Sequence, residues 1–140
     1  MEVKRRLAMK IIYNGKKEFT VNVRNHSFTV DQPVDNGGEN KGPTPPEIFA
    51  ASLGTCIGVY VASYCNTKGI KTEGLMFDVD WKFSEEHEKI EEISVKIFMP
   101  DESYKAREKA ILRVAEHCLI HNTITGNPKI DLSINKKQEA

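Results

Sequence analysis

The stretch IFAASLGTCIGVYVASYC, from Ile48 to Cys65, carries no charged residue over 18 positions and holds a cysteine, Cys56, near its middle. A segment of this kind either crosses a membrane or forms a helix that is buried on nearly all sides. Its length barely reaches that of a membrane span, and hydroxyl-bearing residues dilute its hydrophobicity. We therefore predict that this segment is a long, buried central helix, and that the protein does not interact with a membrane.

Start and stop signals flank this helix. Thr44 can cap its N-terminus, with Pro45 at the first helical position, where a missing N–H costs nothing. Glu47 stands three residues after Thr44, which is the spacing of a capping box. The segment from Asn66 to Gly69 supplies the stop.

The bulk properties predict one domain spanning residues 1–140, since a chain of this length fits a single core. Twenty basic and 20 acidic residues give a net charge of zero, and no basic stripe points to nucleic acid. The basic start, Met1–Arg6, is not followed by an apolar run long enough for a signal peptide. With three cysteines, an odd count, we predict a reducing, cytoplasmic location.

The segments before the helix predict three strands. Met9–Tyr13 stops at the turn signal Asn14-Gly15, and apolar residues then alternate over Phe19–Val23 and Phe28–Val30. Residues Asp31–Pro46, rich in Gly and Pro, predict a loop.

Two strands, a second helix and a last strand follow the long helix. Alternation predicts strands over Leu75–Phe83 and Ile93–Met99, and again over Ile130–Ile134. Helical spacing predicts a second helix from Asp101 to about Leu119, with Cys118 on its buried face. The order β-β-β-α-β-β-α-β, with hairpins predominating, indicates an α+β fold with mostly antiparallel sheets.

The thiols Cys56 and Cys118 are the candidates for chemistry, although each also fits a small buried core residue. Cys65 lies nine residues after Cys56, half a turn away and about 13 Å along the helix axis, so we interpret it as core. A reactive thiol needs a stabilised thiolate. Cys56 is far from the helix N-terminus, and Cys118 is placed near a C-terminus, where the helix dipole disfavours an anion.

A positive group must therefore come from elsewhere. Arg24, the only arginine between Arg6 and Arg107, is placed at a strand end near the loop that leads to Glu47. A solvated strand end explains Arg24 equally well, and the capping box alone explains Glu47.

Two histidines bracket Cys118. The Cys118-x-x-His121 spacing, completed by Cys56, suits a zinc site. His117 and His121 at a helix C-terminus, interacting with its carbonyls and dipole, are the favoured interpretation.

Two motifs resemble those of the OsmC/Ohr family of peroxide-reducing proteins. The run Gly42–Phe49 followed by Ala51-Ser52-Leu53-x-x-Cys56 resembles its helix-opening motif, and Ala115–Thr123 resembles its second-cysteine motif. The resemblance covers roughly residues 9–134. It implies an intertwined homodimer with both long helices at its centre, wrapped by sheets from both chains.

The resemblance also implies roles for four residues. Cys56 matches the cysteine that attacks the peroxide, Cys118 the resolving cysteine, and Glu47 the carboxylate that holds an active-site arginine. In the best-known members that arginine lies in the turn between the first two strands, where this chain has only Lys16 and Lys17. Arg24 is the substitute by elimination, and the two lysines are its alternatives.

Three functional hypotheses follow. The first is a thiol-dependent peroxidase that reduces organic hydroperoxides through a Cys56 sulfenic acid and a Cys56–Cys118 disulfide, without a bound cofactor. Its external dithiol reductant would be a lipoyl protein or a thioredoxin-like protein. The second is a non-redox dimer that binds a small ligand in an apolar pocket. The third is a zinc site at Cys56, Cys118 and His121.

Overall fold

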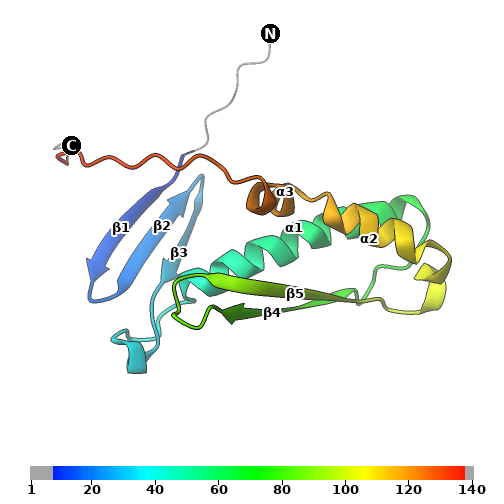
Figure 1. The fold of residues 1–140 in the computed structure, drawn as a ribbon, viewed down its shortest axis with the longest axis horizontal. Coiled ribbons are helices and arrows are strands. Elements are labelled where there is room, and N and C mark those ends of the chain that lie inside the picture. Colours follow the sequence, from blue (N-terminus) through cyan, green and yellow to red (C-terminus); the bar gives the residue numbers. More distant parts are fainter. Residues whose placement is uncertain (1–7, 138–140) are drawn as a thin grey trace, which may run out of the picture. The chain divides into compact units, whose positions relative to one another are not determined.

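The computed structural model describes residues 8–137, and so the basic start Met1–Arg6 lies outside the described residues. Five strands, β1 to β5, and three α-helices, α1 to α3, follow the order β1-β2-β3-α1-β4-β5-α2-α3 (Figure 1). The predicted α+β class is confirmed. Packing divides the chain into two compact units. The first comprises residues up to Ala51 with Asp80–Ile93, and the second comprises Ser52–Val79 with residues from Ser94 onward. A single domain spanning residues 1–140 stays a prediction.

Three strands of the first unit form an antiparallel meander with β2 in the middle. They are β1 (Lys10–Gly15), β2 (Glu18–Val23) and β3 (His26–Val30). Gly15 is at φ 112°, a conformation that suits glycine, and the register shifts there, so that the chain turns at Lys16-Lys17. The second hairpin turns at Arg24-Asn25, with Arg24 in the left-handed region at φ 52°.

The loop after β3 is organised around a buried carboxylate. Asp31 is 1% exposed and accepts hydrogen bonds from the backbone N–H groups of Gln32 (2.7 Å), Glu39 (3.2 Å) and Lys41 (3.1 Å). Burial raises the pKa of Asp31, but these three bonds and the Lys41 charge outweigh it, so that the pKa lies below its ordinary value. These bonds hold together the loop that precedes α1 in the sequence and includes the 3-10 helix η1 (Val34–Asn36).

Helix α1 (Pro45–Thr67) begins and ends where the sequence predicts. Thr44 and Glu47 form the capping box: Glu47 N–H donates to Thr44 Oγ1 (3.4 Å), and Thr44 N–H donates to Glu47 Oε1 (2.8 Å). At the other end Gly69 is at φ 70°, and Ile70 N–H donates to the Cys65 carbonyl (2.8 Å). This pattern is a Schellman motif.

One stripe of α1 is buried in the single chain. Its members recur at three- and four-residue steps and are Ala50, Leu53, Ile57, Val61 and Cys65. Between them Val59 is 64% exposed and Tyr60 39% exposed, so one chain covers only part of the helix that we expected to be buried on nearly all sides. By length and composition α1 could cross a membrane, and 33% of its most apolar window is buried inside the protein.

A hairpin follows α1. Strands β4 (Met76–Phe83) and β5 (Ile90–Phe98) pair with each other, and the short connection makes them antiparallel. The predicted alternation is confirmed in β4, where Phe77 and Val79 are half-buried between exposed neighbours. Both side chains lie close to α1, over Gly58 and Gly54.

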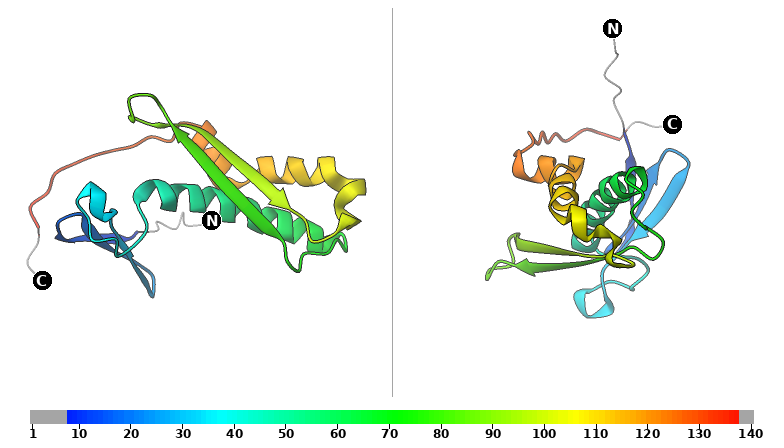
Figure 2. Two further views of the ribbon diagram at one scale, coloured as in Figure 1. Left: turned by 90° about the horizontal axis from the view of Figure 1, so that it is seen from below. Right: turned by 90° about the vertical axis from the view of Figure 1, so that its right-hand side faces the viewer.

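The second helical region differs from the prediction. Asp101 caps the 3-10 helix η2 (Glu102–Arg107), which leads into α2 (Glu108–Glu116). The chain then breaks at His117-Cys118, and α3 (Leu119–Thr125) begins. Figure 2 shows α2 alongside α1, and Arg107, which immediately precedes α2, donates from Nη1 to Tyr64 Oη of α1 (3.4 Å). Cys118 is therefore at the start of a helix and not, as predicted, at the end of one.

The predicted last strand is absent from the described residues. Residues 127–137 have no regular secondary structure, and Ile130, Leu132 and Ile134 are 77%, 93% and 102% exposed. An alternating segment becomes a strand only when another strand supplies the other half of its hydrogen bonds, and the single chain provides none here.

Candidate active site

The two candidate thiols meet in the second unit. Cys56 is half-buried at the middle of α1, and Cys118, with no exposed surface, precedes α3. The two side chains lie close enough for Cys56 to raise the pKa of the Cys118 thiol. More than 60 residues separate them in sequence. The fold therefore brings together the two cysteines that the sequence analysis singled out.

Cys118 is the N-cap of α3. Its sulfur accepts a hydrogen bond from the backbone N–H of His121 (3.2 Å). Burial raises the pKa of the Cys118 thiol, and the neighbouring Cys56 thiol raises it further, against the lowering effect of the N–H groups of His121 and Ile120. The prediction that a helix C-terminus disfavours an anion at Cys118 is wrong, because the thiol lies at the N-terminal, positive end of α3. Burial, not the dipole, keeps it protonated.

Cys65 is separate from this pair. It has no exposed surface, lies in the buried stripe of α1, and burial raises its pKa. No disulfide joins any of the cysteines. Its burial agrees with the interpretation of Cys65 as core.

Glu47 uses only one carboxylate oxygen for its cap. Both the N–H and the hydroxyl of Thr44 donate to Oε1, each at 2.8 Å. These two bonds, the backbone bond first, lower the pKa of Glu47. Oε2 is left available for a further donor, so the cap and a role in orienting a cation are compatible.

The candidate cations lie on the surface of the first unit. Arg24 is exposed at the β2–β3 turn, and within the described part of the chain it forms no ion pair with Glu47. Lys16 pairs with Glu39 at 3.6 Å. The structure thus does not bring Arg24 and Glu47 together.

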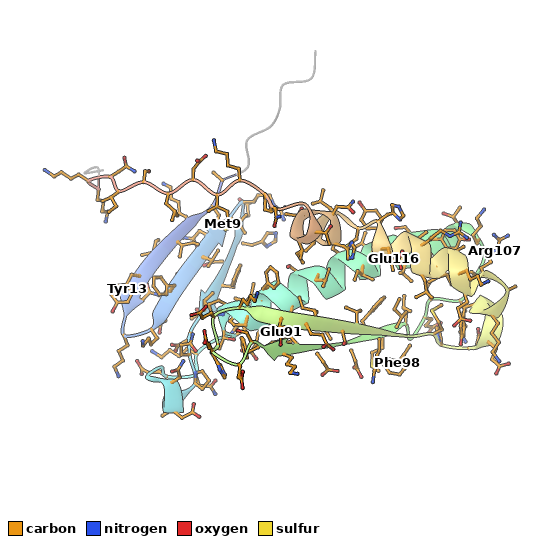
Figure 3. All side chains as sticks on the ribbon, in the orientation of Figure 1. Met9, Tyr13, Glu91, Phe98, Arg107 and Glu116 are labelled. Carbon is orange, nitrogen blue, oxygen red and sulfur yellow. The ribbon has the colours of Figure 1, made fainter. Side chains whose placement is uncertain are left out.

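The histidines on either side of Cys118 differ in their bonding. His117 Nδ1 lies 2.6 Å from the carbonyl oxygen of Arg113, which agrees with the expected role of a histidine at a helix C-terminus. His121 Nδ1 is buried and has no hydrogen-bond partner among the described residues. Figure 3 labels Arg107, which immediately precedes α2, and Glu116, the last residue of α2. Sequence reasoning missed the break before α3, because cysteine is not a preferred N-cap residue.

A metal site is not supported. Among residues 8–137 no group of three His, Cys, Asp or Glu side chains could hold a metal ion. The described residues therefore do not support the zinc hypothesis for Cys56, Cys118 and His121.

An apolar pocket lies within the first unit. It has a volume of about 530 Å³ and lies between one face of the three-stranded sheet and the first turns of α1. Its lining has no charged side chain and consists of Met9, Ile11, Phe19, Val21, Phe28, Val30, Pro45, Ile48 and Phe49.

The family follows from comparison with known proteins. The model of the OsmC-like protein family matches residues 38–133, which include Glu47 and both paired cysteines. The chain therefore belongs to the OsmC-like protein family. No match was found among curated proteins.

Several solved structures share the fold of this chain. A Psychrobacter arcticus 273-4 protein, named for osmotic stress induction and detoxification response, is 19% identical with a TM-score of 0.77, over 88% of this chain and 91% of that one. An OsmC-like protein from Mycoplasma pneumoniae is 20% identical with a TM-score of 0.71, over 89% and 91%. An organic hydroperoxide resistance protein OsmC from Legionella pneumophila is 18% identical with a TM-score of 0.64, over 90% and 93%. These TM-scores establish a shared fold.

Proposed function

We propose that this protein is a thiol-dependent peroxidase that reduces organic hydroperoxides. The observation that carries the proposal is the proximity of Cys56 and Cys118, two thiols from distant parts of the chain. Membership of the OsmC-like family, and the hydroperoxide resistance named for one structural relative, support the same chemistry.

The reaction divides the work between the thiols. Cys56 thiolate attacks the distal peroxide oxygen, the O–O bond breaks, and the alkoxide takes up a proton to leave as an alcohol. Cys56 is then a sulfenic acid. The thiol of Cys118 condenses with it to give a disulfide and water, and an external dithiol reduces that disulfide by exchange. Cys56 is the more accessible of the pair, which suits the first step.

A cation is needed for the first step. We assign Arg24 to stabilise the Cys56 thiolate and the developing alkoxide, with Glu47 Oε2 orienting the guanidinium. The assembly that brings these groups together is a homodimer. The exposed apolar face of α1 around Val59 and the unpaired segment 127–137 both support the assignment of a dimer.

Intact mass after one equivalent of cumene hydroperoxide tests the proposal. We expect the reduced protein to lose two hydrogens, and Cys56→Ser to lose none. Cys65→Ser should behave like the unaltered protein, since Cys65 is not part of the pair. An unaltered mass after treatment would overturn the peroxidase assignment.

The apolar pocket supports a second candidate function, the binding of a lipid-like ligand without redox chemistry. Binding of a fluorescent fatty-acid analogue to the unaltered protein, together with loss of that binding in Phe28→Glu, would favour this candidate. Phe28 lines the pocket, and Phe83, which does not, provides the control Phe83→Glu.

A further inference from the structure

A second pocket of the first unit combines a carboxylate with aromatic rings. It has a volume of about 490 Å³ and lies where the loop after β3, the first turn of α1 and the β4–β5 hairpin meet. That volume falls within the range of small-molecule sites, about 300–1,000 Å³. The apolar pocket of the same unit has a different lining, so the two pockets suit different ligands. The lining of this second pocket includes Gln32, Asn36, Glu47, Trp81, Phe83 and His87.

Glu47 gives this pocket a negative charge. No other acidic side chain, and no lysine or arginine, is found among the described residues that line the pocket. The two bonds from Thr44, the backbone bond first, hold the pKa of Glu47 below its ordinary value, so the carboxylate is ionised at neutral pH. Both bonds end on Oε1, each at 2.8 Å, which leaves Oε2 as the acceptor for a ligand.

The β4–β5 hairpin contributes the aromatic side chains. Trp81 and Phe83 are two residues apart in β4, and so they lie on the same face of the strand. His87 stacks on Phe83, with 5.2 Å between the ring centroids and 21° between the ring planes. Aromatic rings attract cations through their electron-rich faces, tryptophan most strongly, and they also pack against the carbon chain of an organic ligand.

The lining disfavours other classes of ligand. An uncharged apolar ligand would take the Glu47 carboxylate out of water without giving it a partner, and an anion would be repelled by it. The bidentate pairing of a guanidinium needs both carboxylate oxygens, but Oε1 already accepts two bonds from Thr44. A compact ammonium head needs only one oxygen. The pocket therefore suits an organic cation with an ammonium head.

We propose that this pocket binds a small organic ammonium ion, whose N–H donates to Glu47 Oε2 and whose carbon chain packs against Trp81 and Phe83. Glu47 also has a part in the proposed peroxidase, because Oε2 is assigned there to orient Arg24. Binding of the ammonium ion is measured without peroxide, so failure of one proposal leaves the other standing.

Titration with butylammonium chloride at constant ionic strength tests this site. Trp81 is the only tryptophan of the chain, so its fluorescence reports on the pocket, and calorimetry follows the same titration. We expect saturable binding at about millimolar concentration, which is the affinity open to a ligand of so few atoms. We expect no binding of n-butanol, which has the same carbon chain and an uncharged head.

Three variants assign the binding to the pocket. Glu47→Gln should weaken it by about 10-fold or more, because the amide keeps an acceptor for Thr44 but removes the charge. Phe83→Leu keeps an apolar side chain without the ring and should weaken it about threefold. Glu86→Gln is the matched control and should change the affinity less than about twofold, because it removes the same charge next to His87 from a residue that does not line the pocket.

Four results would overturn the inference. They are the absence of saturable binding by both methods, equal binding of n-butanol, unchanged affinity in Glu47→Gln or Phe83→Leu, and equal weakening in Glu86→Gln. Binding that appears only in Arg24→Met would show that Arg24 itself occupies the pocket, and it would overturn the inference as well.

Discussion

Cys118 holds a position that serine, threonine, asparagine or aspartate usually occupies, because the N-cap side chain must accept a hydrogen bond from the helix. A thiol is a weak acceptor. Its use here places a reactive group, fully buried, against a second thiol. Substitution can separate the cap from the proposed chemistry, because a hydroxyl can accept the capping hydrogen bond but cannot form a disulfide.

We therefore expect Cys118→Ser and Cys118→Ala to share one defect and differ in another. Both should stall after peroxide treatment, with Cys56 trapped as a sulfenic acid. Cys118→Ser keeps an N-cap acceptor, so it should be more stable to urea than Cys118→Ala by about 1 kcal/mol. Equal stability would show that the cap contributes nothing, and continued disulfide formation in either variant would contradict the resolving role.

Arg24 gives a second prediction at the scale of single residues. Arg24→Met should slow the alkylation of Cys56 by iodoacetamide at neutral pH, because the thiolate loses its cation. Lys16→Met and Lys17→Met are matched controls, and each should leave the rate unchanged. Arg24 is at φ 52°, and because arginine and methionine are both non-glycine residues, the substitution changes the backbone strain little. If a lysine variant slows alkylation and Arg24→Met does not, the cation is a lysine of the β1–β2 turn.

At the scale of elements, signals that lie within a few residues of each other were sufficient to predict where α1 begins and ends. The capping box of Thr44 and Glu47 and the stop at Gly69 set the bounds of α1 as predicted. The helical period between Asp101 and Leu119 predicted one helix and missed the break at Cys118. Cysteine is not among the residues preferred at an N-cap, so the sequence did not indicate that the Cys118 sulfur caps α3.

Two glycines of α1 make the third prediction. A Cβ at Gly54 would lie 2.7 Å from Val79 Cγ2, whereas at Gly58 it would meet Phe77 at 3.4 Å, an ordinary contact. Alanine favours a helix interior by about 1 kcal/mol over glycine. Gly58→Ala should therefore be neutral or more stable.

Gly54→Ala should be less stable by about 1–2 kcal/mol, because the β-branched Val79 side chain has little freedom to move away. Urea unfolding followed by circular dichroism measures both variants. A Gly54→Ala variant as stable as Gly58→Ala would show that the hairpin can shift away from α1.

At the scale of the whole molecule, two patterns in the sequence indicate surroundings that one chain alone does not provide. The alternation at Ile130, Leu132 and Ile134 indicates a strand, but the described residues provide no partner for it. The uncharged run of α1 indicates burial on all sides, but only one stripe is covered. Both patterns record an environment that a single copy of the chain does not supply.

The last prediction concerns that environment. If two copies bury the exposed face of α1 against each other, Val59→Glu places an unpaired carboxylate in the interface. The cost of about 3 kcal/mol or more should raise the dimer dissociation constant by at least about 10²-fold. Val34→Glu is the matched control, since Val34 is 73% exposed in η1, away from α1 in sequence. Sedimentation equilibrium at micromolar concentration should find dimers for the unaltered protein and for Val34→Glu, and monomers for Val59→Glu. A stable, folded monomer of the unaltered protein would contradict the dimer, and the proposed assembly of the site would have to be found within one chain.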